Sequence, residues 1–339
     1  MWVPRAATRT APTVQRRFFL YRVAKLCYTA AMTHVRRSRF YYLAWALCFL
    51  WAARWSVAQQ DAPSVTDERF FEAYRRGQPI TQWPLKKMLH EIPELKGLKP
   101  AIDQSQLPII LDRVSANLQR FVANFANTTA LETIDETAMA ATTRRTARIE
   151  QFRYLILARP ESGAFTLTEY RTDLKGREES GEGLTPEFIK TTGFVSMALF
   201  FGPLEQPWSD FHHLGEHAVD GSPTEVIAFA EHIWPVAVTG HWLVGGGSVP
   251  LLVQGVAWIR SSDYQIIKMR TDLLAPIPPL TRMTTKVSYA MNQLEGGPPD
   301  FWLPKQVEVI VDIGRFEFTN RHKYADYRLF RVESIIKPD

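Results

Sequence analysis

A stretch of alternating side chains at residues 251–274 constrains the fold more than any other part of the sequence. In its second half, one face carries side chains without charge: Ile267, Met269, Thr271 and Leu273. The other face carries charges: Lys268, Arg270 and Asp272. This period of two is typical of a half-buried β-strand. Turn-forming Ser261, Ser262 and Asp263 precede the strand, so we predict a β-hairpin.

The centre of the turn sets the pairing register of this hairpin. A loop with an even number of residues, centred between Ser262 and Asp263, places Trp258 opposite Ile267 and Val256 opposite Met269. The core face is then Leu252, Val256, Trp258, Ile267, Met269 and Leu273. Because a slip of one residue would turn this whole set to water, we expect a well-specified register. Trp258 and Met269 should both face the helix predicted at 105–126.

The rest of the chain adds strands joined mostly by hairpins. We predict strands at 148–157, 164–172, 211–219, 224–231, 284–291, 305–313 and 324–336, besides the two of the central hairpin. Nine strands without βαβ alternation indicate one antiparallel sheet. The fold class that we expect is α+β, with a strongly curved sheet, a half-open barrel, covered on one face by helices.

Two helices are predicted to accompany this sheet. Apolar residues recur at steps of three and four from Leu111 to Phe125, and Pro108 suits a first turn, so residues 105–126 should form an amphipathic helix. A second helix is expected from Pro186 to Phe201, with Thr185 as its cap. Residues 59–104 read as an irregular helical segment, and residues 105–337 as the curved-sheet domain.

The first 58 residues are interpreted as a leader outside the fold. They contain ten Lys or Arg and no acidic residue, and without them the remaining 30 basic and 35 acidic residues change the net charge from +5 to −5. The sequence pI of about 9.1 therefore describes the leader. A basic groove for nucleic acid is not indicated, so we expect no nucleic-acid partner.

Residues 32–58 have the three parts of a secretory signal. Arg36, Arg37 and Arg39 supply positive charge, 40–53 is an apolar run, and Ser56-Val57-Ala58 offers small residues for cleavage after Ala58. The run is short for a membrane span of about 20 residues, although an uncleaved anchor is the alternative. Met32 directly precedes the charges and is our preferred start; a genuine long leader is the other interpretation.

Residues with catalytic or metal-binding chemistry do not form a recognised motif. Cys27 and Cys48 both lie in the leader, so the mature chain would have no disulfide. His213 and His217 would share a helix face, but Gly215 favours a strand, in which four residues span about 13 Å, too far for one ion. We therefore predict no metal, no cofactor and no catalytic residue, with a histidine-dependent hydrolase as a third hypothesis.

The aromatic content carries more information. Aromatic residues sit on helices and strands that are predicted to face one another, and they either pack a closed core or border an apolar cavity. Eight residues are the candidates for lining such a cavity: Phe121, Phe125, Phe229, Val256, Trp258, Ile267, Met269 and Tyr289.

Several segments resemble an uncharacterised family of secreted bacterial proteins over about residues 85–337. The segments are Leu111–Val114, Gly255–Ile259, Met269–Leu274, Trp302–Pro304, Asn320–His322 and Tyr324–Arg328. The order of elements also resembles the periplasmic lipoprotein carriers with the LolA/LolB-like fold. That resemblance implies a half-open barrel that holds acyl chains under helical lids, and it transfers no catalytic residue.

These observations lead to a functional expectation with two alternatives. We expect an exported, non-enzymatic protein of the periplasm, or a secreted one, that binds a lipid or another apolar ligand between the curved sheet and its helices. Its partner would be a lipid or an acylated protein, with only transient membrane contact. The alternatives are a cell-envelope interaction module with a filled core and the hydrolase named above.

Overall fold

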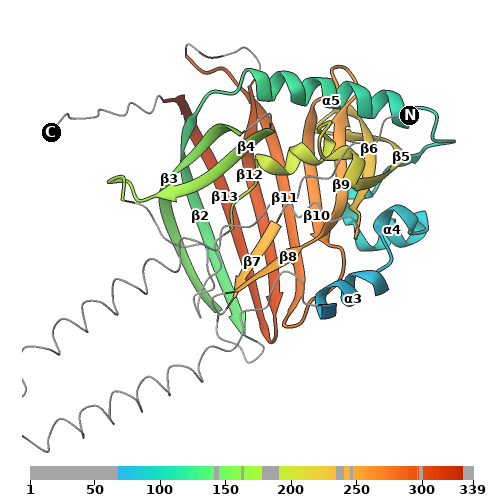
Figure 1. Cartoon of the computed structure of the whole chain (residues 1–339), viewed down its shortest axis with the longest axis horizontal. Helices are drawn as coiled ribbons and strands as arrows, with labels where there is room; N and C mark the ends of the chain where they lie inside the picture. Colours follow the sequence, from blue (N-terminus) through green and yellow to red (C-terminus); the bar gives the residue numbers. More distant parts are fainter. Residues whose placement is uncertain are drawn as a thin grey trace, which may run out of the picture. The chain divides into compact units, whose positions relative to one another are not determined.

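Eleven strands of the described chain form one antiparallel sheet, in the order β1-β5-β6-β9-β10-β11-β12-β13-β2-β3-β4 (Figure 1). This computed structural model describes residues 68–140, 145–161, 164–177, 191–233, 240–244, 247–295, 297 and 301–330. All of them belong to one unit, Ala62–Asp339. The predicted leader, with its signal and cleavage position, lies outside the described residues.

The strands of this sheet are as follows. They are β1 (Lys99–Pro100), β2 (Thr128–Ala140), β3 (Arg145–Glu161), β4 (Ala164–Thr172), β5 (Ser209–Val219), β6 (Ser222–Glu231), β9 (Val253–Arg260), β10 (Ile266–Leu273), β11 (Leu280–Asn292), β12 (Phe301–Ile313) and β13 (Phe316–Leu329). A separate two-stranded sheet is formed by β7 (Gly240–Val244) and β8 (Gly247–Leu251).

Short helices precede and interrupt the sheet. The α-helices are α3 (Glu68–Arg76), α4 (Leu85–Glu91) and α5 (Leu107–Ala123), and the 3-10 helices are η1 (Ile80–Gln82), η2 (Pro93–Leu95), η3 (Ser196–Phe201) and η4 (Gln206–Trp208). The amphipathic helix predicted at 105–126 is α5, with Pro108 in its first turn. In Figure 1, α5 runs across the upper ends of the strands.

The predicted fold class, a curved antiparallel sheet with helices, is confirmed, but the strand count of nine was too low. No strand was predicted between the helix and residue 148, but residues 128–140 form β2 between β13 and β3. The last strand begins at Phe316 and ends at Leu329, earlier than the predicted 324–336. The two-residue β1 was also missed; it pairs with β5 at Gly215, where a Cβ atom would stand 2.0 Å from the Lys99 carbonyl oxygen.

The predicted helix Pro186–Phe201 is wrong over the part that the structure describes. Residues 191–193 are not helical, and only the short 3-10 helix η3 forms at the end of the predicted range. Residues 178–190 lie outside the described chain. We call residues 193–201 the inner strap.

The register predicted for the central hairpin holds next to the turn and fails beyond it. Ile259 pairs with Ile266 as expected, but the register then shifts at Ile267, so Trp258 pairs with Lys268. Met269 pairs with Ala257 rather than Val256. The physical reason is a β-bulge, which inserts one residue into one strand and reverses the faces after it. Trp258 and Met269 therefore lie on opposite faces of the sheet.

Both faces of the sheet are covered where this hairpin lies. The outer face carries Arg270, whose guanidinium meets Glu94 of η2, and Gln254, which accepts the Ile80 amide N–H at 2.6 Å. The inner face carries Phe229, which packs against Phe200 and Phe201 of the inner strap. This double cover explains why Trp258 and Met269 are both fully buried although they point in opposite directions.

Candidate functional site

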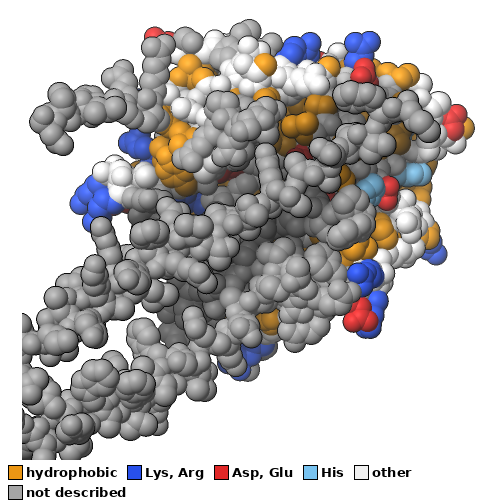
Figure 2. Space-filling view, in the orientation of Figure 1, with side chains coloured by type: hydrophobic (Ala, Val, Ile, Leu, Met, Phe, Trp, Pro, Cys, Tyr) orange, Lys and Arg blue, Asp and Glu red, His pale blue; other side chains and the backbone are white. Residues whose placement is uncertain are grey.

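A small cavity on the inner side of the sheet lies between α5, the inner strap and the β9–β10 turn. Its volume is about 30 Å³. The side chains that line it are mainly apolar and include Val114, Leu118, Phe121, Ala198, Ile266 and Tyr289. Figure 2 shows hydrophobic side chains in the strip directly below α5. A volume of this size holds about one water molecule, so the core is nearly filled here.

The cavity is bounded by contacts that a few polar groups hold in place. The Asn117 side chain of α5 donates to the carbonyl oxygens of Asp263 and Tyr264 in the β9–β10 turn, at 2.7 and 2.9 Å. Tyr264 adopts a left-handed backbone conformation in this turn, with a φ of 59°. On the other side, the Tyr289 hydroxyl donates to the Phe194 carbonyl oxygen of the inner strap at 2.9 Å.

The eight residues predicted to line a cavity are only partly brought together. Phe121 and Tyr289 line it, and Phe125 packs against Phe121 and Phe301, at ring distances of 5.2 and 5.1 Å. Phe229 and Met269 are buried on the same inner face but do not line the cavity.

The other three predicted residues are separated from this group by the bulge. Ile267 is the bulged residue and is half-buried, while its neighbour Ile266 lines the cavity. Val256 pairs with Arg270 and Trp258 with Lys268, so both lie on the outer face. The sequence pattern could not place them, because both faces are buried at this point of the sheet.

A buried polar network occupies the other half of the inner face, on β13, β2, β3 and β4. Its centre is Glu132, which is fully buried. The Glu132 carboxylate accepts from Arg171 Nη2 at 2.8 Å, from the Tyr324 hydroxyl at 2.7 Å and from His322 Nδ1 at 2.9 Å. Sequence reasoning missed this network, since its members lie 39 to 192 residues apart.

The charges in this network stabilise one another. Burial raises the pKa of Glu132, but the Arg171 guanidinium and His322 outweigh burial and lower that pKa to about 2. Burial lowers the pKa of His322, against the opposing effect of Glu132. Because Glu132 is a carboxylate acceptor, His322 carries its proton on Nδ1, and its Nε2 remains a buried acceptor without a hydrogen-bond partner among the described residues.

Glu169 fastens the inner strap beside this network. Its carboxylate accepts the backbone N–H groups of four consecutive residues, 193–196, at 2.8 to 2.9 Å. The Ser196 hydroxyl and the Tyr154 hydroxyl donate to the same carboxylate. Phe194 is thereby held over His322, with ring centroids 5.0 Å apart. The inner strap thus covers both the polar and the apolar half of the inner face.

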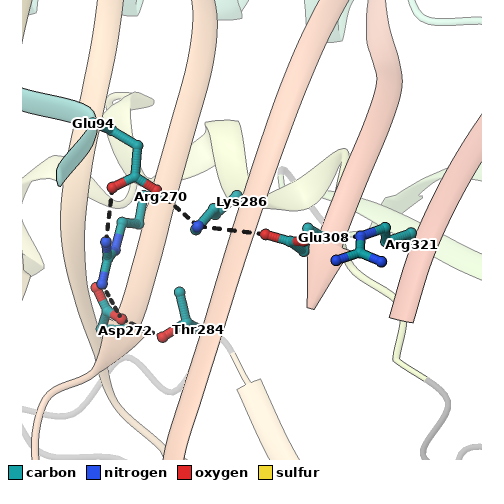
Figure 3. Close-up of polar contacts among 7 residues, drawn as sticks. All are labelled: Glu94, Arg270, Asp272, Thr284, Lys286, Glu308 and Arg321. Atoms are coloured by element: carbon teal, nitrogen blue, oxygen red, sulfur yellow. Dashed lines mark hydrogen bonds and ion pairs between the residues drawn. The ribbon is translucent and has the colours of Figure 1, made fainter. Parts of the chain in front are cut away.

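The outer face carries a ladder of charges across β10, β11, β12 and β13, shown in Figure 3. Arg270 and Lys286 are cross-strand neighbours with the same charge, and Glu94 of η2 lies between them, 3.0 and 2.9 Å from their nitrogens. Glu308 continues the ladder to Arg321. Burial raises the pKa of Glu94, but Lys286 and Arg270 outweigh it and lower the pKa to about 2. This ladder fixes η2 on the sheet.

His213 and His217 of β5 each contact a different polar partner. His213 Nε2 lies 2.9 Å from Glu225, and His217 Nε2 lies 2.9 Å from the Lys96 carbonyl oxygen. A bulge after His213 places the two on opposite faces, because they pair with Ile227 and Thr224. Within the described residues, no three His, Cys, Asp or Glu side chains lie close enough to hold a metal ion.

Comparison with known proteins gives structural neighbours at low sequence identity. A DUF1329 family protein from Desulfovibrio piger is 11% identical, with a TM-score of 0.38, over 67% of this chain and 94% of its own. A putative outer membrane lipoprotein-sorting protein domain from Vibrio parahaemolyticus is 10% identical, with a TM-score of 0.34, over 65% of this chain and 91% of its own.

A LolA superfamily protein from Nitrosomonas europaea is also similar, at 10% identity and a TM-score of 0.33, over 67% of this chain and 94% of its own. The solved structures to which this chain is similar thus include DUF1329 and LolA-superfamily proteins. No family model matches the chain. No curated protein matches its sequence. None of the described helices has the length and hydropathy to cross a membrane.

Proposed function

We propose that this chain is an exported, non-enzymatic protein that binds a lipid or another apolar ligand on the inner face of its sheet, beneath α5 and the inner strap. The observation that carries the proposal is the apolar cavity at the junction of these three elements. Asn117 joins α5 to the β9–β10 turn, Tyr289 joins the sheet to the inner strap, and Glu169 fastens the strap from β4. The ligand would be a free lipid or the acyl group of a protein, as in a lipoprotein carrier.

The volume of the cavity implies that the described form is closed. Pockets for ligands of drug size measure roughly 300–1,000 Å³, about ten times the 30 Å³ found here or more. An acyl chain would therefore enter when α5 or the inner strap moves away from the sheet. Burial of the chain contributes about 0.8 kcal/mol per methylene, which offsets the packing interactions that this movement breaks.

A substitution that fills the cavity tests this proposal. Ala198 lines the cavity from the inner strap, so Ala198→Phe should lower the affinity for a fluorescent fatty acid by about tenfold or more. Ala116 is exposed on α5, and the matched variant Ala116→Phe should bind like the parent. Fluorescence titration of the three proteins measures the effect. A parent protein that binds no fatty acid, alkyl amine or alkyl alcohol would contradict the proposal.

Export is a separate part of the proposal and rests on residues 32–58. The mature protein should begin at Gln59, after cleavage at Ala58. N-terminal sequencing of the protein from the periplasmic fraction or the culture medium checks this. An intact apolar run retained in the inner membrane would contradict it.

The nearly filled core favours a second candidate function, a cell-envelope module that binds a protein partner at its surface. In that case the inner face would be structural and Ala198→Phe would only destabilise the fold. The hydrolase hypothesis has weaker support. Glu132 and His322 are within hydrogen-bond distance, but His322 Nε2 has no hydrogen-bond partner in the described chain and therefore activates none of the described hydroxyls.

A further inference from the structure

We propose that the polar half of the inner face, around His322, binds the head group of the ligand and selects a head group that donates hydrogen bonds, an amine in preference to a carboxylate or phosphate. This inference rests on the proposed function and adds the chemical class of the ligand. It is carried by an unpartnered buried acceptor, by the sign of the surrounding charge and by the position of the inner strap.

The acceptor is His322 Nε2. The ring is fully buried, and its Nδ1 donates a hydrogen bond to the Glu132 carboxylate at 2.9 Å. Within the described part of the chain, its Nε2 has no hydrogen-bond partner. A buried acceptor without a donor costs free energy, and a donor brought by a ligand would remove that cost. A head group with an N–H or O–H meets this requirement, whereas a carboxylate or a phosphate dianion brings only acceptors.

The described charges on this half of the inner face are mainly negative, which favours a donor that carries a positive charge. The strand pairing places four carboxylates and two guanidinium groups on the described inner face of β2, β3 and β4: Glu132, Glu136, Glu150 and Glu169, with Arg148 and Arg171. Among the described residues this is an excess of two negative charges, which attracts a cation and repels an anion, most strongly where water is excluded. An amine is therefore favoured over a neutral hydroxyl, and both over an anionic group.

The position of the inner strap indicates where the head group and the alkyl chain of the ligand would lie. Phe194 covers His322, and Phe200 and Phe201 cover Phe229 farther along the same face, at ring distances of 5.3 and 5.4 Å. His322 on β13 is the cross-strand neighbour of Val307 on β12, so the polar and apolar halves meet at this pair. A ligand that displaces the inner strap would place its head at His322 and its chain over the apolar strands.

The test compares four amphiphiles with the same chain: tetradecylamine, tetradecanol, tetradecanoate and tetradecyl phosphate. Each displaces an apolar fluorescent dye from the protein at concentrations below micelle formation. We expect the parent to bind the amine at least about tenfold tighter than the carboxylate and the phosphate, with the alcohol between them. Equal or tighter binding of the carboxylate or phosphate would overturn the inference but leave the proposed function standing.

Variants test whether the preference for the amine arises at His322. His322→Leu removes the acceptor and should reduce the preference of amine over carboxylate to about threefold or less. His212→Leu, on the outer face of β5, is the matched control and should keep it. If His322→Leu does not fold, as judged by its thermal melt, Glu136→Gln lowers the negative charge of the same surface and should also reduce the preference. An unchanged preference in a folded variant would overturn the inference, and a parent that binds no amphiphile would refute the proposed function with it.

Discussion

One bulged residue determines which side chains of the central hairpin reach the inner face. The alternation from Ile267 to Leu273 is real, but Ile267 takes the extra position, so all residues after it are reversed relative to β9. Lys268 consequently lies with its amine 4.8 Å from the Trp258 ring on the outer face. A bulge of this kind leaves no clear pattern in the sequence, because a single inserted residue reads as one more step of the strand.

The position of Trp258 gives a prediction at the residue scale. Trp258 is fully buried on the outer face, so Trp258→Ala should lower the free energy of unfolding by about 3–5 kcal/mol. Binding of a fluorescent fatty acid by the folded fraction should not change, because the cavity lies on the inner face. Ile149→Ala, at a side chain that is 71% exposed, is the control and should stay within about 0.5 kcal/mol. Denaturant melts with a binding titration measure both; a loss of binding at full stability would contradict the face assignment.

At the scale of elements, β2 and the inner strap differ from what their local sequences suggest. In both, the polar groups are paired by side chains that are distant in the sequence. In β2, Glu132 and Glu136 lie on the buried face between Ala130, Ile134 and Ala138, so the alternation of a half-buried strand is obscured. Arg171 and Arg148 from neighbouring strands pair with these carboxylates. In the inner strap, Glu169 takes the backbone N–H groups of residues 193–196, which are then not available to α-helical carbonyl oxygens.

The inner strap should loosen when its acceptor is weakened. Glu169→Gln replaces carboxylate oxygens that accept four backbone N–H groups with a single amide oxygen, and we expect a loss of about 2 kcal/mol or more in the free energy of unfolding. Amide hydrogen exchange at residues 193–196 should become faster, and fatty-acid affinity should rise because the closed form is less favoured.

The exposed Glu216 provides the matched control for this variant. Glu216→Gln should leave stability within about 0.5 kcal/mol and exchange at residues 193–196 unchanged. Hydrogen-exchange mass spectrometry of the three proteins measures the effect. Equal exchange in Glu169→Gln and the parent would show that Glu169 does not hold the inner strap.

At the scale of the whole molecule, the sheet separates two layers with different chemistry. The outer layer is fastened by ion pairs such as those of Glu94, whose side chain is 15% exposed. The inner layer combines an apolar half with a polar network that joins β13, β2 and β4 through Glu132. Both layers respond to acid, because the pKa values of Glu94 and Glu132 are both lowered to about 2, and the inner network adds the buried imidazole of His322.

Stability should therefore fall on acidification in two steps. The pKa of His322 is lowered from its usual 6.5, so below pH 6.5 the unfolded chain takes up a proton that the folded protein does not. The pKa of Glu132 is lowered from 4.5 to about 2, so stability is lost again as the pH falls from 4.5 toward 2, by up to about 3 kcal/mol. Urea melts across pH 7 to 3 measure the profile.

A variant separates the two steps of this profile. His322→Phe removes the imidazole and keeps a ring against Phe194, so the slope between pH 7 and 5 should become flatter. The slope below pH 4.5 should remain, since Arg171 and Tyr324 still hold Glu132. The same slope between pH 7 and 5 in parent and variant would show that His322 does not carry the first step.

The sequence by itself determined the features that depend on local periodicity. The period of two predicted the antiparallel sheet and the central hairpin, and the period of three to four predicted α5 within a few residues of its observed bounds. These patterns involve residues that are close in the sequence. They match the structure because each element buries one stripe of side chains.

Only the tertiary structure decided which face each strand presents and which polar groups meet. Both faces of the sheet are buried at the central hairpin, so hydrophobicity could not tell inner from outer. Glu132 reads as an ordinary exposed carboxylate in sequence, yet it is fully buried because Arg171, 39 residues away, and His322, 190 residues away, converge on it. The candidate head-group site depends on such distant pairs, and their free energy exists only once the strands are aligned.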